Sequence, residues 1–314
     1  MAVHAHPDDE SISTGGILAR YAAEGVRTVL VTCTDGGGGD GEDGAKPGQP
    51  GHDRASVIAA RQAELERSAK VLGVTHLETL GYADSGMMGW PDNDEPGSFW
   101  QTPVSEAAGR LAQLMRRYEP QVVVTYDPNG FYGHPDHIQA HRITVAAARL
   151  TAIPDKLYYT AVPRSRMAEF GRRLQELGIE FGEDDGGADE GGRTDDGGAD
   201  EGGRTDEGGR AGAPGSADEG GRGGGPGSGG EAPAGPREEW GTPDDQVTTY
   251  VEVARYADRK FDSLHCHESQ SDNIFFLKMG RDVFGELMGM EAFVRAEDRT
   301  GAPVPEDDLF AGLR

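Results

Sequence analysis

Two short clusters of histidine and aspartate stand out in the sequence, each following an apolar stretch. The first is HAHPDDE at 4–10, which follows the apolar start at 1–3. The second is HPDH at 134–137, which comes shortly after QVVVTY at 121–126. Imidazole and carboxylate groups are the usual zinc ligands in hydrolases, where three protein ligands leave one position open for water. The clusters therefore predict a metal-dependent hydrolytic site.

The residue types also suggest a division of roles within these clusters. Three side chains supply two nitrogens and one oxygen to a metal: His6, Asp9 and His137. Asp8 is then free to accept a proton from the attacking water as a general base. His134 is the expected proton donor or oxyanion stabiliser, and Asp136 is expected to orient it through a hydrogen bond. A single His-Pro-Asp is usually a set of polar residues in an exposed loop, but two such clusters after buried strands favour a metal site.

The rest of the sequence alternates between strand and helix patterns. Apolar, mostly β-branched runs predict strands at 1–3, 27–33, 74–81, 121–126, 156–162, 246–253 and 291–295. Helical patterns cover 11–24, 53–72, 103–118, 138–150, 164–177 and 256–269, with a partly helical stretch at 274–288. This alternation predicts an α/β fold with a mostly parallel sheet and a smaller C-terminal α+β part. In the strand order 3-2-1-4-5, the first and fourth strands are neighbours, and both histidine clusters would face one crevice.

One acidic, glycine-rich region accounts for most of the unusual composition. The chain carries a net charge of −25, and 182–236 holds 14 Asp or Glu and 4 Arg. The sequence GGADEGGRTDD at 186–196 recurs almost unchanged at 197–207. These repeats contain no large apolar residue, so stacking them would bury nothing. We therefore expect one domain over 1–314, interrupted by a disordered insertion at 182–240.

The composition also limits which classes of binding partner and which cellular compartment are expected. The acidic charge argues against nucleic acid as a partner, because phosphate binding needs a basic face. No apolar run is long enough for a membrane span, and the start lacks the pattern of a signal peptide. Cys33 and Cys266 form no disulfide framework, so a reducing cytoplasm is expected. We expect a small-molecule substrate, and homo-oligomerisation is left open.

Two further motifs are weaker indications of a ligand site. The loop GGGGDG at 36–41 fits a dinucleotide-binding pattern, but 42–51 is acidic and rich in proline and glycine. No helix would therefore begin there to hold a pyrophosphate. His265 and His267 flank Cys266 near a helix end, but such positions on a helix point apart. We therefore expect no second metal, and a structural or substrate-contacting role for His267.

The motifs AHPDDE at 5–10 and HPDH at 134–137, in this order, resemble the GlcNAc-PI de-N-acetylase (PIG-L/LmbE) family. That family includes the deacetylase of mycothiol biosynthesis and mycothiol S-conjugate amidase. The resemblance covers the chain apart from the glycine-rich repeats. It implies a Rossmann-like fold and a divalent metal, usually Zn²⁺, at one per chain, with Fe²⁺ as an alternative. It also implies hydrolysis of an N-acyl group on an amino sugar of the N-acetylglucosamine type.

The resemblance also assigns roles by position. It gives the metal ligands as His6, Asp9 and His137, the base as Asp8, and the oxyanion stabiliser and its partner as His134 and Asp136. It further implies that Tyr132 closes over the site, that Arg61 contacts the substrate and that Asp84 accepts a sugar hydroxyl. Each of these three has a plainer interpretation: a packing aromatic, a solvated ion pair and a turn residue, respectively.

Three functions remain open at this point. The first is removal of an N-acetyl group from an N-acetylglucosamine-type sugar. An amidase acting on a mycothiol S-conjugate would use the same site chemistry. A metal- or sugar-binding protein without turnover is the third, although binding alone needs neither the spare base Asp8 nor His134.

Overall fold

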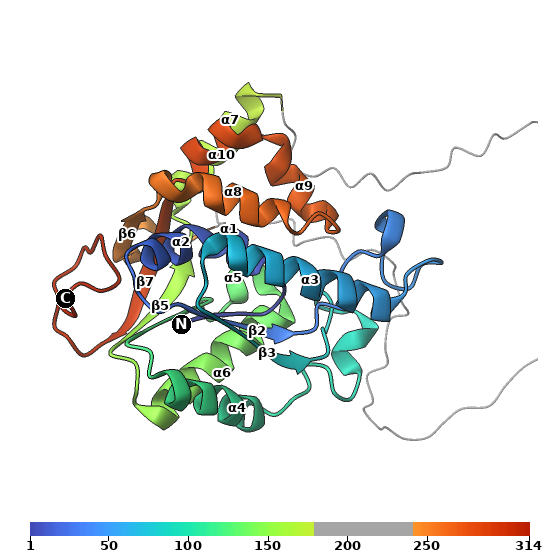
Figure 1. Cartoon of the computed structure of the whole chain (residues 1–314), viewed down its shortest axis with the longest axis horizontal. Helices are drawn as coiled ribbons and strands as arrows, with labels where there is room; N and C mark the ends of the chain where they lie inside the picture. The colour runs from blue at the N-terminus through green and yellow to red at the C-terminus, as the bar shows by residue number, and fades with distance from the viewer. Residues whose placement is uncertain (179–240) are drawn as a thin grey trace, which may run out of the picture. The chain divides into compact units, whose positions relative to one another are not determined.

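The computed structural model describes residues 1–178 and 241–314, which build a single seven-stranded sheet (Figure 1). The expected insertion at 182–240 lies outside the described residues. The strands are β1 Ala2–His4, β2 Val29–Thr34, β3 His76–Tyr82, β4 Val122–Thr125, β5 Lys156–Ala161, β6 Thr249–Glu252 and β7 Met290–Asp298. Their order is β3-β2-β1-β4-β5-β7-β6. The predicted order of the first five strands is therefore confirmed.

The first five strands are parallel, and the C-terminal strands extend the same sheet in the opposite sense. β1 pairs in parallel with both β2 and β4. β7 pairs antiparallel with β5 and with β6, so it crosses back along the edge of the parallel part. The C-terminal strands expected from the sequence thus continue the main sheet rather than forming a sheet of their own.

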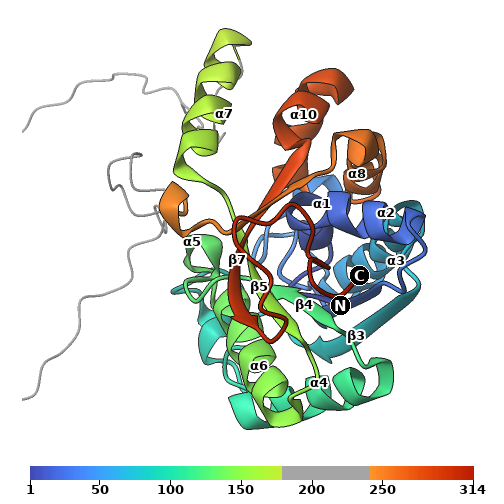
Figure 2. The same ribbon diagram turned by 90° about the vertical axis from the view of Figure 1, so that its left-hand side faces the viewer.

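Helices cover both faces of this sheet (Figures 1 and 2). Their bounds are α1 Asp9–Ser13, α2 Gly15–Ala23, α3 Arg54–Leu72, α4 Val104–Tyr118, α5 Gly130–Gly133, α6 Pro135–Thr151, α7 Arg164–Glu176, α8 Ala257–His265, α9 Ser271–Lys278 and α10 Gly280–Met288. Helices α4 and α6 lie on one face, and α2, α3 and α8 lie on the other. No helix in the part of the chain described here is long and apolar enough to cross a membrane.

The central strands are buried on both faces because their side chains alternate between two cores. Val3 and Val31 pack with α4 and α6 in one core. Ala2 and Leu30, their neighbours along the strands, pack with Leu65 and other residues of α2 and α3 in another. Because both faces of these strands are buried, their sequences are continuously apolar and do not alternate between apolar and polar residues.

Helix boundaries follow local signals where those are strong. Asp53 caps α3 by accepting a hydrogen bond from the backbone nitrogen of Ser56 at 3.3 Å. The helix ends at Gly73, which has a φ of 77° and supplies the left-handed turn there. Both ends of this helix are as the sequence predicts.

The single helix predicted over 11–24 is wrong, since α1 and α2 are separated at Thr14. The backbone of Thr14 has φ −140° and leaves the helical conformation. Its hydroxyl is 2.8 Å from the His4 Nε2 atom and also donates to the backbone oxygen of Glu10 at 3.3 Å. A hydroxyl that bonds the preceding turn and a distant side chain competes with helix continuation.

Gly16 lies at the start of α2, close beneath Val253. A Cβ at this position would lie 2.5 Å from Val253 Cγ2 and 2.9 Å from Glu291 Oε1. We therefore expect Gly16→Ala to lower the free energy of unfolding by about 1–3 kcal/mol, as overpacked cores do. Urea denaturation followed by circular dichroism measures this. In contrast, Gly109→Ala in α4, where a Cβ meets nothing within 4 Å, should stabilise by about 0.5–1 kcal/mol. Equal effects of the two changes would contradict this account.

Candidate active site

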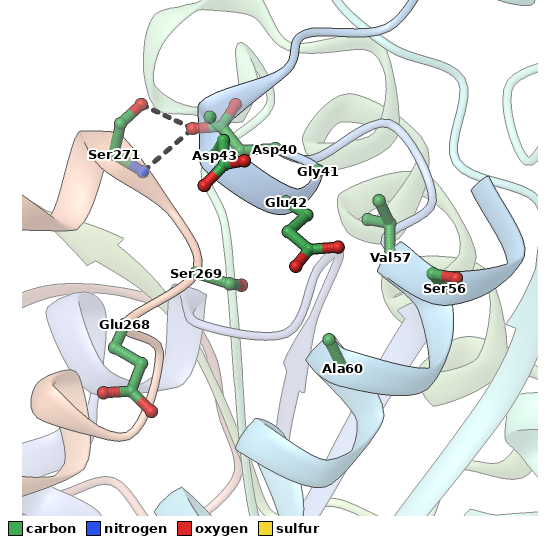
Figure 3. A pocket seen from close by; sticks show the side chains of 11 residues that line it. Asp40, Gly41, Glu42, Asp43, Ser56, Val57, Ala60, Glu268, Ser269 and Ser271 are labelled. Atoms are coloured by element: carbon green, nitrogen blue, oxygen red, sulfur yellow. Dashed lines mark hydrogen bonds between the residues drawn. The ribbon is translucent and has the colours of Figure 1, made fainter. Parts of the chain in front are cut away.

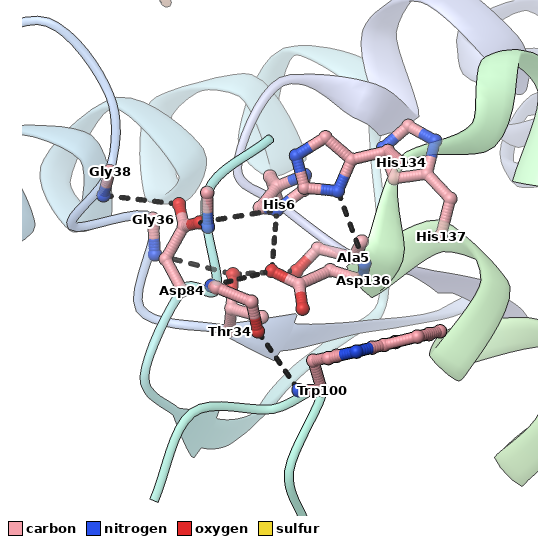
Figure 4. Close-up of polar contacts among 12 residues, drawn as sticks. Ala5, His6, Thr34, Gly36, Gly38, Asp84, Trp100, His134, Asp136 and His137 are labelled. Atoms are coloured by element: carbon pink, nitrogen blue, oxygen red, sulfur yellow. Dashed lines mark hydrogen bonds and ion pairs between the residues drawn. The ribbon is translucent and has the colours of Figure 1, made fainter. Parts of the chain in front are cut away.

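The two histidine clusters meet at the carboxyl ends of β1 and β4, which are neighbours in the sheet (Figure 4). His6 lies just after β1, His134 caps the N-terminus of α6, and His137 lies in the first turn of that helix. The ring centroid of His6 is 4.6 Å from that of His134 and 5.3 Å from that of His137. The sequence places this second cluster in a loop before a helix at 138, whereas α6 begins at Pro135, a residue that suits the first helical position.

Asp9 lies between two of the imidazoles. Its Oδ2 atom is 3.4 Å from Nδ1 of His6, and its Oδ1 atom is 3.4 Å from Nε2 of His137. The hydroxyl of Tyr126 donates to Oδ2 at 2.6 Å, and the backbone nitrogen of His6 donates to it at 2.7 Å. The three predicted metal ligands, His6, Asp9 and His137, are thus brought together.

The side chain of Asp136 has a different partner from the one the sequence predicts. Its carboxylate accepts a hydrogen bond from Nε2 of His6 at 3.1 Å and one from the backbone nitrogen of Ser85 at 2.9 Å. His134 instead accepts, at Nδ1, the backbone N–H of Asp136 at 3.1 Å. The Asp136 carboxylate therefore orients His6, and His134 is oriented by the start of the helix that it caps.

The charges of this cluster are strongly coupled. Burial lowers the pKa of His6, but the carboxylates Asp84, Asp136 and Asp9 outweigh it and raise that pKa well above its usual range. Burial would raise the pKa of Asp9, but His137 and His6 hold it well below its ordinary value. Burial lowers the pKa of His137 to about 4, and burial together with His6 and His137 holds the pKa of His134 well below its ordinary value. Both of these histidines are therefore neutral near pH 7.

The residues present fit a divalent metal. His137 donates from Nδ1 to the backbone oxygen of Gly130 at 3.3 Å, which leaves the lone pair on Nε2. That buried Nε2 has no hydrogen-bond partner among the described residues, and it faces the Asp9 carboxylate. Two electron-rich atoms facing each other in a buried place call for a cation between them. Two overlapping sets of three buried residues could hold a metal ion, because one donor atom from each residue lies within 4.8 Å of the other two in its set. The first set is His6, His134 and His137, and the second is His6, Asp84 and Asp136.

Asp8 points its carboxylate at a buried arginine. Nη2 of Arg61 donates to Asp8 Oδ2 at 3.0 Å, and Nδ2 of Asn273 donates to the same oxygen at 3.3 Å. Burial raises the pKa of Asp8 to about 6, although the Arg61 charge opposes this shift. An aspartate with such a pKa is close to the range in which a general base works well at neutral pH.

The structure places the other three predicted residues around the cluster. Arg61 is 4% exposed and bonds to Asp8, so a solvated ion pair is not its role. Asp84 is 5% exposed and accepts hydrogen bonds from the backbone nitrogens of Gly86 at 2.8 Å and Gly38 at 3.1 Å. The bond to Gly86, two residues on, is the one expected of a turn residue. Tyr132 is 47% exposed, and its ring centroid is 5.1 Å from that of His137. Of the three, Tyr132 is the most accessible to a ligand.

Sequence reasoning missed three side chains that shape the site. Tyr126 bonds Asp9, Asn273 bonds Asp8, and Glu10 accepts the backbone N–H of Asp8 at 3.0 Å. Tyr126 is the last residue of the predicted strand at 121–126 and Glu10 is the last residue of the motif at 5–10, so their positions were a usable signal. Asn273 lies far along the chain, and no local pattern marks it.

The glycine-rich loop after β2 borders a separate cavity of about 530 Å³ (Figure 3). Its lining comes from this loop, the start of α3 and the segment 268–271. Asp40 accepts from both the backbone nitrogen, at 2.9 Å, and the hydroxyl of Ser271, which ties the loop to the C-terminal part of the chain. The first α-helix after this loop is α3, which begins at Arg54.

Comparisons with known proteins agree with this geometry. Residues 1–148 match the PIG-L family, described as GlcNAc-PI de-N-acetylase. A Thermobifida fusca 1D-myo-inositol 2-acetamido-2-deoxy-alpha-D-glucopyranoside deacetylase is 38% identical over 99% of this chain and 98% of its own length. A Thermomonospora curvata protein of the same name is 36% identical over 100% of this chain and 96% of its own length. The chain is thus an amide hydrolase of the deacetylase class. It belongs to the PIG-L family, as its two motifs predict.

Solved structures share the fold at low sequence identity. The N,N'-diacetylchitobiose deacetylase from Pyrococcus horikoshii matches with a TM-score of 0.50 and 17% identity, over 94% of this chain and 82% of its own. The hydratase GalB from Pseudomonas putida matches with a TM-score of 0.52 and 16% identity, over 96% of this chain and 97% of its own. Because one is a deacetylase and the other a hydratase, the fold alone does not define the reaction.

Proposed function

We propose that this chain hydrolyses the N-acetyl group of an N-acetylglucosamine-type amino sugar, with N-acetylglucosaminyl-inositol as the leading candidate. The observation that carries this proposal is the Asp8 carboxylate, held beside the cluster of His6, Asp9 and His137. The substrate is suggested by the full-length relatives, which are named as deacetylases of an inositol-linked acetamido sugar.

The metal in this proposal is Zn²⁺ at one per chain, with Fe²⁺ as the alternative. His6, Asp9 and His137 would hold it, because their nitrogen and oxygen atoms match a hydrolytic zinc site. When bound, the ion supplies positive charge that polarises the acyl carbonyl and makes water more acidic. Asp136 and Tyr126 would hold the ligands in place through their hydrogen bonds to His6 and Asp9.

The side chains of the chain itself carry the proton steps. Asp8 takes a proton from the attacking water, whose oxygen forms a bond to the acyl carbon while the carbonyl electrons move onto oxygen. His134 accepts a backbone N–H at Nδ1, so its proton lies on Nε2, where it can donate to that oxyanion. Tyr132, whose ring centroid is 6.0 Å from that of His134, would donate beside it. The carbon–nitrogen bond then breaks, and a proton from Asp8 or His134 passes to the amine, which releases acetate and the free amino sugar.

Acetate release tests this proposal directly. Zinc-loaded wild type would be assayed on N-acetylglucosamine and on N-acetylglucosaminyl-inositol, beside a chelated sample. We expect release from the inositol conjugate, a lower rate on the free sugar and loss of both on chelation. No release from either, with zinc still bound, would reject the proposal and favour a larger amide such as a thiol conjugate, or binding without turnover.

Asp136 offers a test of the metal site that needs no substrate. Removing its carboxylate in Asp136→Ala takes away the hydrogen bond to His6 Nε2, while the backbone N–H that orients His134 remains. We expect zinc affinity to fall by about 10–100-fold, as it does when outer partners of ligating histidines are lost. Competition with a chromophoric chelator measures this affinity. His141→Asn, on the same helix but bonded to the backbone oxygen of Tyr126, is the control and should keep wild-type affinity.

A further inference from the structure

Asp8 has an unusual backbone conformation. Its φ is 113° and its ψ is −31°, a region that residues other than glycine rarely occupy. Such a conformation costs about 1–3 kcal/mol and persists only where the surroundings impose it. Other side chains must therefore hold Asp8 in this conformation.

The carboxylate of Glu10 is the first part of that support. Its Oε2 atom accepts the backbone N–H of Asp8 at 3.0 Å. Its Oε1 atom accepts from Nε2 of His267 at 2.8 Å, from the hydroxyl of Ser11 at 2.9 Å and from the hydroxyl of Ser68. The side chains of Glu10 and His267 are both 0% exposed. The backbone of Asp8 is thus anchored to a histidine 257 residues later in the chain.

This anchor is a charged pair. Burial alone would raise the pKa of Glu10, but His267 and the hydrogen bonds lower it to about 2. Burial alone would lower the pKa of His267, but the Glu10 carboxylate raises it. Charged hydrogen bonds are stronger and more directional than neutral ones, so this pair fixes the Glu10 carboxylate firmly.

Asn273 supports the carboxylate of Asp8 itself. Its Nδ2 atom donates to Asp8 Oδ2 at 3.3 Å and lies 3.5 Å from the backbone oxygen of His267. Arg61 donates to the same oxygen, Oδ2, at 3.0 Å. Because both of these donors bond Oδ2, Oδ1 is the oxygen that would receive a proton from water.

His267 lies in the turn that follows α8, and Asn273 lies in the first turn of α9. The turn after α8 is held against α3 by Ser269, whose backbone nitrogen and hydroxyl donate to the Glu64 carboxylate at 3.0 and 2.8 Å. The C-terminal part of the chain therefore packs over the base without supplying any of the predicted metal ligands.

We propose that His267 and Asn273 are positioning residues for the base: His267 fixes the backbone of Asp8 through Glu10, and Asn273 fixes its carboxylate. This inference rests on the proposed role of Asp8. It assigns the C-terminal turn a part in the chemical step, in addition to its packing role.

Steady-state kinetics of zinc-loaded protein test the proposal. We expect Asn273→Ala and His267→Ala to lower kcat by about 10–100-fold, as small misplacements of reacting groups do, with KM and bound zinc unchanged. His267→Gln keeps a donor for Glu10 and should recover most of the rate. Glu268→Gln is the matched control, because Glu268 lies in the same turn, its side chain is 80% exposed and it pairs only loosely with Arg67 at 3.9 Å. This variant should keep the wild-type kcat.

Crystal structures of the variants test how Asp8 is positioned, and they need no substrate. In His267→Ala, Asp8 should leave its positive φ, and in Asn273→Ala its carboxylate should rotate about the remaining bond to Arg61. If His267→Ala does not fold, the Asn273→Ala variant, which leaves no buried charge unpaired, still tests the proposal. An unmoved Asp8, or a kcat equal to that of wild type, would overturn it. An inactive wild type whose variants still show a displaced Asp8 would instead count against the proposed function alone.

Discussion

Asp8→Asn is expected to lower kcat for acetate release by about 10²–10⁴-fold, the usual contribution of a general base. Asparagine keeps the size of the side chain and leaves an oxygen to accept from Arg61 and Asn273. It cannot accept a proton from water, because an amide is not basic. The measurement is steady-state kinetics on N-acetylglucosaminyl-inositol with zinc-loaded enzyme.

Two properties of the Asp8→Asn variant, its bound zinc and its KM, should match those of wild type. Bound zinc per chain should equal that of wild type, because Asp8 is not among the expected ligands, and KM should change little. Asp53→Asn is a suitable control, because asparagine caps a helix as well as aspartate does. If Asp8→Asn retained more than about a tenth of the wild-type kcat, well above what loss of a general base allows, Asp8 would not be the base and His134 would become the candidate.

Glu306→Gln is expected to cause the largest loss of stability among the changes considered. Glu306 accepts from Lys156 Nζ, from Tyr158 Oη at 2.8 Å and from Arg295 Nη1 at 2.8 Å, and so joins β5 to β7. The side chains of Lys156 and Glu306 are 0% and 1% exposed. Breaking a buried ion pair by removing one partner leaves the other charge uncompensated and costs about 3–5 kcal/mol. Urea denaturation measures this cost.

A second variant separates the uncompensated charge from simple loss of packing. Adding Lys156→Met to Glu306→Gln removes the buried cation, and we expect a substantial part of the lost stability to return. Glu286→Gln breaks an ion pair with Arg173 in which Glu286 is 58% exposed, and it should change the free energy of unfolding by less than about 1 kcal/mol. A double variant no more stable than the single one would contradict this explanation.

Much of the site could be predicted from the sequence because its chemistry is carried by short motifs at strand ends. Alternating strand and helix patterns identified the parallel sheet. The strand order assumed for it, which the structure has, brings His6 and His137 together. The same reasoning placed Asp8 beside the cluster, since it lies two residues from His6. These conclusions depend only on local periodicity and on the rule that ligands bind where neighbouring strands diverge.

Which side chain bonds to which was decided by the tertiary structure. The sequence paired Asp136 with His134, but packing turns the Asp136 carboxylate towards His6. The break between α1 and α2 likewise depends on His4, a partner that no helix pattern contains. A hydrogen bond is directional over a few ångströms, whereas a sequence pattern specifies only which face or strand end a residue occupies.

The sequence by itself determined the class of chemistry, the alternation of strands and helices, and the histidine and aspartate residues that gather at the strand ends. Only the tertiary structure decided how Asp8 is held: its backbone has a positive φ, and it is anchored through Glu10 to His267 and directly to Asn273. His267 and Asn273 each lie more than 250 residues further along the chain than the residue that they contact. Their contact arises from the packing of α8 and α9 over the site, and no local pattern encodes that packing.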